Sequence, residues 1–194
     1  IVIDGGSTDA TAMLASVDAD RVLNSARGRA RQMNVGAAEA TGDALLFLHA
    51  ATRLPDNAAA LIDTALQQRC WGRFDVRIEG RPAMLGLIAR MMYLRSRLSG
   101  IATGDQAMFI SRATFEQVGG FPEQALMEDI ALSKRLKRLG PPACLRQQVV
   151  TSGRRWERHG VWRTMLLMWR LRFDYWRGVP AERLAARYVA HKDD

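Results

Sequence analysis

The sequence predicts an α/β fold with a mostly parallel sheet flanked by helices, and three observations lead to this prediction. An apolar run at 1–3 ends on Asp4 and turns through Gly5 and Gly6, as a buried strand does when it passes into a helix. Similar runs alternate with helix-like segments through the first half of the chain. The chain has 194 residues, of which 48% are hydrophobic, so one sizeable core is expected.

The first half is expected to hold strands over 1–4, 21–24 and 44–49 and helices over 10–16, 27–40 and 55–69. The second half is expected to hold strands over 71–79, 106–111 and 143–151 and helices over 82–98 and 129–139. Because large and polar residues alternate over 71–79, that strand is predicted to be an edge or antiparallel strand. Since the sequence begins inside a strand and without methionine, we expect a further strand before Ile1.

Two helices from residue 161 onward, separated by Gly178-Val179-Pro180, form a C-terminal extension. We therefore divide the chain into a main domain over 1–158 and an amphipathic extension over 159–194. Aromatic and apolar residues recur at helical spacing in the extension: Trp162, Leu166, Trp169, Phe173 and Trp176. Three roles stay open for this helix face, namely packing on the sheet, contact within a homodimer, or peripheral contact with a membrane.

The net charge is +8, and only three of the 28 basic residues are lysines. Because the guanidinium fork suits phosphate, the expected partner is anionic. The sequence has no nucleic-acid recognition motif, so a nucleic acid is not expected. Cys70 and Cys144 lie far apart and are expected to be reduced. No apolar run approaches ~20 residues and no signal peptide is visible, so we expect a cytoplasmic protein, with a peripheral place on the inner membrane face left open.

Five motifs resemble the family 2 glycosyltransferases of the GT-A fold, in particular small single-domain bacterial members. They lie, in the order of that family, at 2–9, 27–36, 47–52, 119–122 and 127–132. The resemblance implies a Rossmann-like GT-A sheet, a nucleoside-diphosphate sugar as donor, and transfer of the sugar with inversion. It implies Mg²⁺ or Mn²⁺ as cofactor. The acceptor is not identified, and a lipid-linked acceptor is one option.

The resemblance also places the nucleotide. It assigns Asp4 to the base, and the neighbouring nucleotide-binding residues would be Gly5, Gly6, Arg27, Arg31 and Asn34. The alternative for Asp4 is a turn or helix-capping residue, but because Ser7 and Thr8 already offer caps, the nucleotide-binding role is favoured. Either arginine can equally belong to a solvated basic helix face.

The loop after 44–49 departs from the family pattern. The family carries an acidic motif there whose last aspartate binds the metal, whereas this chain has His49 and Ala51 at the corresponding positions. A methyl group cannot coordinate Mg²⁺ or Mn²⁺, so metal binding is expected to be weakened. The alternatives are a single isolated replacement, a metal held by neighbours such as His49 and Asp105, and a protein with little or no transferase activity.

Glu128 and Asp129 resemble the acidic pair of inverting members, with Asp129 as general base and Glu128 in support. Both can equally be acidic residues that favour a helix start. Further candidates for contact with the diphosphate or the acceptor are Gln106, Arg154, Arg155 and Trp156. The leading hypothesis is thus an inverting glycosyltransferase, and the alternative is a catalytically silent nucleotide-sugar-binding or scaffolding protein.

Overall fold

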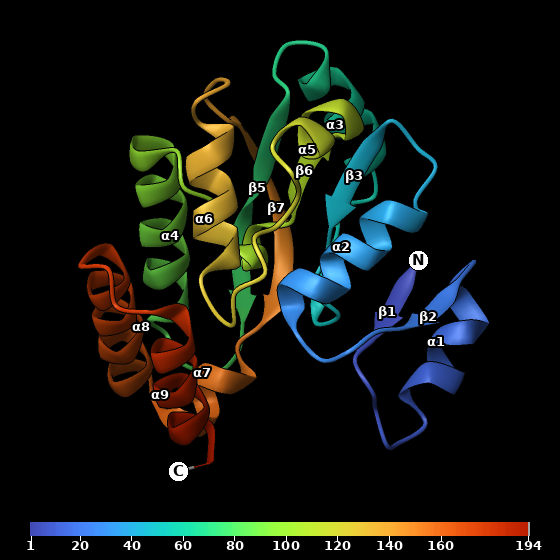
Figure 1. Cartoon of the computed structure of the whole chain (residues 1–194). Coiled ribbons are helices and arrows are strands. Elements are labelled where there is room, and N and C mark those ends of the chain that lie inside the picture. The colour runs from blue at the N-terminus through green and yellow to red at the C-terminus, as the bar shows by residue number, and fades with distance from the viewer. Residues whose placement is uncertain (194) are drawn as a thin grey trace.

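The strands of the chain form two separate sheets in the computed structural model, which describes residues 1–193 (Figure 1). A small parallel sheet pairs β1 (Val2–Asp4) with β2 (Val22–Asn24). A five-stranded sheet has the order β3-β6-β5-β7-β4. Its strands are β3 (Ala44–Phe47), β4 (Thr52–Arg53), β5 (Trp71–Glu79), β6 (Met108–Ser111) and β7 (Ala143–Ser152).

The five-stranded sheet is mixed, whereas the sequence predicted a mostly parallel one. Only β5 and β7 pair in parallel, and the pairs β3–β6, β5–β6 and β4–β7 are antiparallel. Strand β5 is antiparallel to β6, but it lies in the centre of the sheet and not at its edge. The α/β class and the flanking helices agree with the prediction. The directions differ because partner choice depends on long-range packing, which the alternation of elements does not encode.

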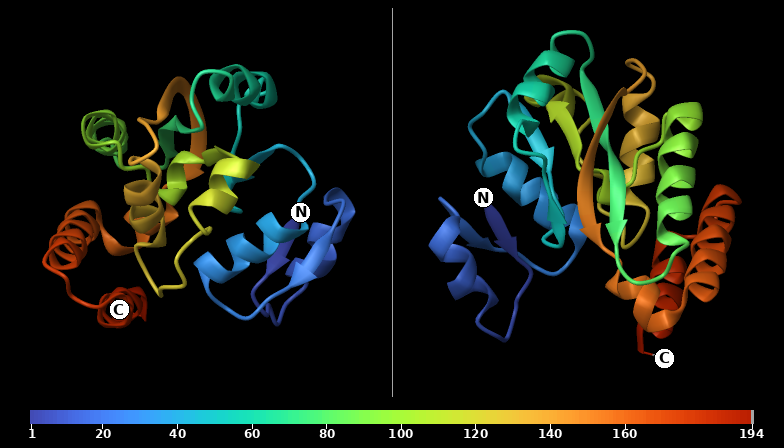
Figure 2. Two further views of the ribbon diagram at one scale, coloured as in Figure 1. Left: turned by 45° about the horizontal axis from the view of Figure 1, so that its top comes forward. Right: turned by 180° about the vertical axis from the view of Figure 1, so that it is seen from behind.

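Helices surround both sheets (Figures 1 and 2). The first half contributes α1 (Thr11–Asp18), α2 (Arg29–Glu39) and α3 (Ala58–Leu66). The second half contributes α4 (Leu85–Ser99), the short 3-10 helix η1 (Gly104–Gln106), α5 (Arg112–Gln117), α6 (Glu128–Leu136), α7 (Arg154–His159), α8 (Val161–Trp176) and α9 (Ala181–Asp193). Helix α5 was not predicted. It begins after Ser111, whose hydroxyl oxygen accepts a hydrogen bond from the backbone N–H of Thr114.

Two apolar clusters cover the two faces of the five-stranded sheet, because successive side chains of a strand point to opposite faces. On β6, Met108 and Ile110 join the cluster formed with α2, α5 and α6, while Phe109 joins the cluster formed with α3 and α4. Both clusters consist of side chains that are almost fully buried. Their positions fix α2 and α6 relative to the sheet and so place the loops that precede these helices.

The C-terminal helices contact the rest of the chain through a third apolar cluster. Leu171 of α8 and Leu184 of α9 pack there with Leu126, Met127 and Ile130 at the start of α6. The boundary predicted at 158–159 falls inside α7. Among the described residues, no helix combines the length and the hydropathy needed to cross a bilayer.

Candidate functional site

A cavity of about 510 Å³ lies where α4, η1, the start of α6, α7 and α8 meet. Asp129 and Asp105 line it together with Arg29 and His49, so four segments that are distant in sequence contribute polar groups. The same cavity is lined by arginines from α4, α7 and α8. The candidate residues His49, Asp105 and Asp129 therefore meet here, whereas Asp4 does not line the cavity.

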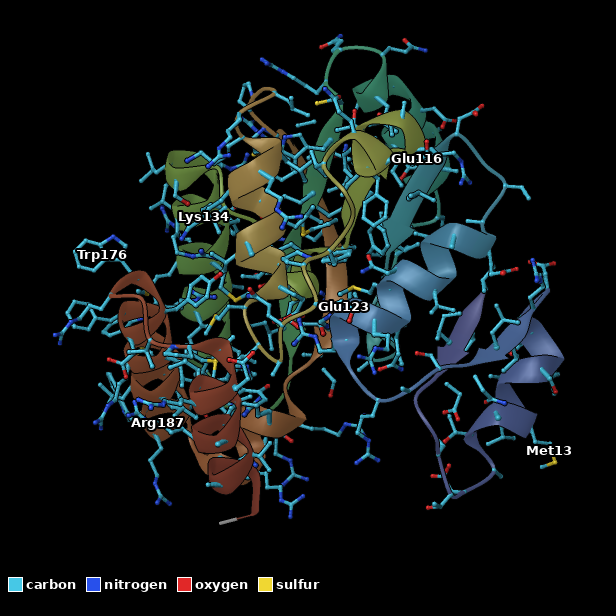
Figure 3. The ribbon with its side chains drawn as sticks, in the orientation of Figure 1. Met13, Glu116, Glu123, Lys134, Trp176 and Arg187 are labelled. Carbon is cyan, nitrogen blue, oxygen red and sulfur yellow. The ribbon has the colours of Figure 1, made fainter. Side chains whose placement is uncertain are left out.

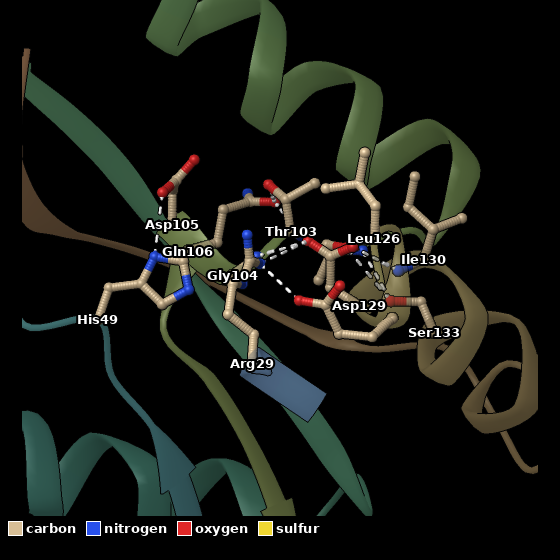
Figure 4. Close-up of polar contacts among 12 residues, drawn as sticks. Arg29, His49, Thr103, Gly104, Asp105, Gln106, Leu126, Asp129, Ile130 and Ser133 are labelled. Carbon is tan, nitrogen blue, oxygen red and sulfur yellow. Dashed lines mark hydrogen bonds and ion pairs between the residues drawn. The ribbon is translucent and has the colours of Figure 1, made fainter. Parts of the chain in front are cut away.

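Asp129 is held at the first turn of α6 by two backbone donors (Figure 4). Its Oδ2 accepts a hydrogen bond from the N–H of Gly104 at 2.9 Å, and its Oδ1 accepts one from the N–H of Ile130 at 2.7 Å. Met127, just before the helix, has a left-handed backbone with φ of 66°, which turns the chain into α6. The carboxylate is thereby fixed in the cavity wall with 12% of the side chain exposed.

Glu128 is buried beside Asp129 and faces a cation. Its Oε1 lies 2.7 Å from Arg29 Nη2, and the same guanidinium lies 3.9 Å from Asp129 Oδ2. Burial raises the pKa of Glu128 above its usual range, although the charge of Arg29 opposes the shift. Arg29 belongs to the 27–36 motif, but the sequence had singled out Arg27 and Arg31 in its place.

His49 and Asp105 form the second polar contact of the cavity. His49 Nδ1 lies 3.3 Å from Asp105 Oδ1. Burial would raise the pKa of Asp105. The pKa is nevertheless below its usual range, because Asp105 is hydrogen-bonded to His49 and is near the charges of His49, Arg29 and Arg172. A Cβ at Gly104 would lie only 2.4 Å from His49 Nε2, so this close approach of the imidazole requires glycine.

The residues around His49 do not make a metal site. Ala51 is exposed in the turn before β4, where it offers only a methyl group and a carbonyl that accepts from the N–H of Ser152 at 3.3 Å. No group of three or more His, Cys, Asp or Glu side chains suited to a metal occurs within the described part of the chain. Mg²⁺ and Mn²⁺ prefer several oxygen ligands, which the pair His49 and Asp105 does not supply.

Three arginines carry the remaining positive charge of the cavity: Arg95 on α4, Arg155 on α7 and Arg172 on α8. None of them forms an ion pair within 4.0 Å with a carboxylate of residues 1–193, in contrast to Arg29. Burial and the charge of Arg172 lower the pKa of Arg95 to about 10. Burial also lowers the pKa of Arg155 and of Arg172.

Asp4 does not line this cavity. Its Oδ2 accepts from the N–H groups of Gly6 and Ser7 at 3.1 and 2.9 Å, and its Oδ1 accepts from the Ser7 hydroxyl. The Ser7 hydroxyl bond, followed by the backbone bonds, lowers the pKa of Asp4. The turn nevertheless adjoins α2, because Gln32 donates to the carbonyl of Ile3 at 3.0 Å and lies against Gly5. In Figure 1 the carboxyl ends of β1 and β3 point to the same end of the molecule.

The other predicted residues are divided between the cavity and its surroundings. Arg155 and Trp156 line the cavity, whereas Arg154 is exposed and donates to the Ser152 hydroxyl. Gln106 is fully buried and does not line the cavity, and its Oε1 accepts from the N–H of Thr103 at 3.2 Å.

The three candidates on and before α2 lie outside the cavity lining. Arg27 is exposed, and Arg31 lies 3.4 Å from Glu123 on the surface. The amide of Asn34 is hydrogen-bonded at both ends to the backbone of Phe121, so it serves the packing of α2 in this structure.

Two solved structures of nucleotide-sugar complexes have a similar fold over about three quarters of this chain. One is residues 1–349 of S. aureus TarS in complex with UDP-GlcNAc, at 15% identity and a TM-score of 0.59, over 78% of this chain and 48% of that chain. Another is the mannosyltransferase PcManGT from Pyrobaculum calidifontis in complex with GDP-Man and Mn²⁺, at 21% identity and a TM-score of 0.55, over 77% of this chain and 46% of that chain. The chain has a glycosyltransferase fold.

The likeness confirms the predicted fold class, and at these identities it shows the fold alone. The chain spans about half the length of the solved structures that it matches. No family model matches the sequence. No curated protein matches it either.

Sequence reasoning missed Arg29, Arg95 and Arg172 as residues of the site. On this glycosyltransferase fold, α4 and α8 bring the last two to the cavity from positions far apart in the chain. No motif marks them. The one available signal was the high arginine content, which indicates an anionic ligand without saying which arginines bind it.

Proposed function

We propose that the chain transfers a glycosyl group from a nucleoside-diphosphate sugar to an acceptor hydroxyl with inversion at the anomeric carbon. One observation carries this proposal: Asp129, fixed by two backbone N–H groups, shares a cavity with arginines that have no carboxylate partner among residues 1–193. The fold supports it, since the similar structures hold UDP-GlcNAc and GDP-Man.

In the proposed reaction Asp129 takes the proton of the acceptor hydroxyl. The acceptor oxygen forms a bond to the anomeric carbon while the bond from that carbon to the diphosphate breaks, and the diphosphate leaves with the electron pair. Attack from the face opposite the leaving group gives inversion. The N–H groups of Gly104 and Ile130 keep the carboxylate oriented throughout. A positioned base of this kind contributes about 10²–10⁴-fold to the rate.

The donor is proposed to lie along the start of α2, with its nucleoside toward Asp4 and its diphosphate toward Arg29 and His49. Two features support this placement. No side chain caps the N-terminus of α2, and an uncapped helix start attracts anions. Arg29 is about half exposed, so part of its guanidinium can reach a ligand while it pairs with Glu128.

A divalent metal, which the resemblance implied, does not fit the described residues, because Ala51 removes the expected oxygen ligand. The proposed step therefore uses the protein's own cations to offset the charge of the diphosphate. The same observation favours a second candidate, a silent nucleotide-sugar-binding protein on this fold. The two candidates differ in whether a bound donor is turned over.

Calorimetric titration with UDP-GlcNAc and GDP-Man, with and without Mn²⁺, tests the proposal when combined with the release of UDP or GDP over time. The transferase proposal expects binding and slow release without added metal. The Ala51→Asp variant is expected to gain Mn²⁺-dependent binding, while Ala50→Asp, in the same turn, controls for the added charge. Binding without release in either protein would favour the silent candidate. Absence of donor binding in both proteins would contradict both candidates.

A further inference from the structure

We propose that the cavity is an acceptor-side site for an amphiphile with a phosphate head group. Its phosphate would lie among Arg95, Arg155 and Arg172, and its hydrocarbon part would lie against the methionines between α4 and α8. The inference depends on the proposed function only in treating this ligand as the acceptor, in which case the hydroxyl that Asp129 deprotonates is the P–OH group of the phosphate.

The three arginines of the cavity form no ion pair within 4.0 Å among residues 1–193, although the charges of Asp129 and Asp105 act on them from further away. The Nε and Nη2 atoms of both Arg95 and Arg155 are buried, and none of these four atoms has a hydrogen-bond partner among the described residues. Arg155 also stacks on Tyr188, with 4.0 Å from the guanidinium carbon to the ring centre, and donates to its hydroxyl. Since buried donors without partners are costly, the set is suited to a ligand with several acceptor oxygens and negative charge. Phosphate has both.

The same cavity also has an apolar lining, which comes from the two helices that carry Arg95 and Arg172. Met91 and Met92 contribute from α4, and Met165, Met168 and Trp169 contribute from α8. Methionine side chains adapt to irregular apolar ligands. A nucleoside-diphosphate sugar is polar along most of its length and has no chain to place against this lining. An alkyl or prenyl phosphate has the matching division into a charged head and an apolar tail.

The outer surface around the cavity supports a lipid as the source of this phosphate. The exposed large apolar side chains of α4 and α8 are Leu87, Met91, Leu94, Leu98, Trp162, Leu166, Trp169, Phe173 and Trp176. Figure 3 shows Trp176 directed away from the ribbon at the side where α8 lies. Exposed arginines accompany them on both helices, namely Arg90, Arg163 and Arg170. Tryptophan and arginine on one helix surface favour an anionic membrane interface.

Titration with dodecyl phosphate below its micelle concentration tests the site. Inorganic phosphate and dodecyl maltoside serve as the two partial ligands. The wild type is expected to bind dodecyl phosphate more tightly than either. Arg95→Gln and Arg172→Gln, made separately, should each weaken that binding about tenfold or more, because each removes charged hydrogen bonds. Arg138→Gln and Arg146→Gln, at exposed arginines outside α4 and α8, are the controls and should change it by less than about twofold.

A double variant, Met91→Gln with Met165→Gln, addresses the apolar lining. It should weaken the binding of dodecyl phosphate and leave the binding of inorganic phosphate unchanged. Melting temperatures and circular dichroism identify any variant that fails to fold. If Arg95→Gln does not fold, Arg172→Gln on helix α8 still tests the loss of one arginine from the cavity.

Several outcomes would overturn the inference. Equal affinity for inorganic phosphate and dodecyl phosphate would indicate a free-phosphate site, and equal affinity for dodecyl maltoside would indicate an apolar groove. Association of the chain with itself that blocks dodecyl phosphate would assign the α4–α8 surface to a dimer. If UDP-GlcNAc binding is lost in the arginine variants in parallel, the cluster belongs to the donor diphosphate. By contrast, arginine-dependent binding of dodecyl phosphate without any donor binding would leave the site standing and contradict the proposed function alone.

Discussion

The side-chain amide of Asn34 binds both backbone groups of Phe121. It donates to the carbonyl at 2.8 Å and accepts from the N–H at 2.9 Å. The Phe121 ring packs edge-on against Phe47, with 4.8 Å between ring centres, and contacts Phe115. This pair therefore joins α2 to the turn at 119–122, which leads toward α6 and the carboxylates of the cavity.

Replacing Asn34 by alanine is expected to lower the free energy of unfolding by about 1–3 kcal/mol, because two partly buried backbone groups lose their partner. Urea unfolding measures the loss. Asn57→Ala is the matched control, since Asn57 is exposed and its side chain does not cap α3. That control should stay within about 0.5 kcal/mol of the wild type. An equal loss in the two variants would contradict the role of the Asn34–Phe121 pair.

Asp75→Asn is expected to destabilise the chain by about 3–5 kcal/mol, since it removes the carboxylate that faces a fully buried cation. Asp75 pairs with Arg73, which has no exposed surface, and with Arg97 at 2.6 Å. The measurement is the urea midpoint, with the exposed Asp63→Asn as control. A loss below about 1 kcal/mol would mean that Arg73 finds enough support from Ser96 and the carbonyl of Tyr93, to which it also donates.

Asp129→Asn is expected to reduce glycosyl transfer by about 10²–10⁴-fold while donor affinity stays within a few-fold of the wild type. The amide oxygen of asparagine can still accept from the N–H of Gly104, so the fold should be retained. The readout is release of the nucleoside diphosphate at saturating donor. Glu123→Gln, on the exposed loop before α6, is the control. Unchanged turnover in Asp129→Asn would show that another group accepts the proton.

The stability of the chain is expected to fall as pH rises above 4.5, the ordinary pKa of Glu128, toward its raised value in the folded state. In this window the unfolded chain has released the proton and the folded chain still holds it, so the unfolded state gains relative stability with pH. Glu128→Gln cannot titrate and should remove this part of the dependence. Urea unfolding between about pH 4 and about pH 8 compares the two proteins. Parallel curves would contradict the prediction.

Local patterns in the sequence predicted most elements to within a few residues. The helix expected over 27–40 is found at Arg29–Glu39, and the strand expected over 143–151 is found at Ala143–Ser152. Periodicity and turn residues set such boundaries locally. The segment at 104–106, partly assigned to a strand, is a 3-10 helix closed by reciprocal hydrogen bonds between Thr103 and Gln106. The spacing of Thr103 and Gln106, three residues apart, is the sequence signature of this capping pattern.

The candidate site was predictable where a motif carries it. Asp129, Asp105 and His49 were each named as candidates from the sequence, and all three line the cavity. The cationic side chains were not predictable, because Arg95 and Arg172 reach the cavity only through the packing of α4 and α8. Among 28 basic residues, sequence spacing alone does not separate such arginines from solvated ones.

Helix α2 touches three parts of the molecule through Gln32 to Ile3, Asn34 to Phe121 and Arg29 to Glu128. Because a short helix moves as a rigid unit, α2 connects the small sheet mechanically with the Glu128 carboxylate. A ligand that binds the turn after β1 and shifts α2 would therefore alter the affinity for a ligand beside Glu128. By thermodynamic reciprocity, a ligand bound beside Glu128 would then change the affinity for a ligand at the turn after β1 by the same factor.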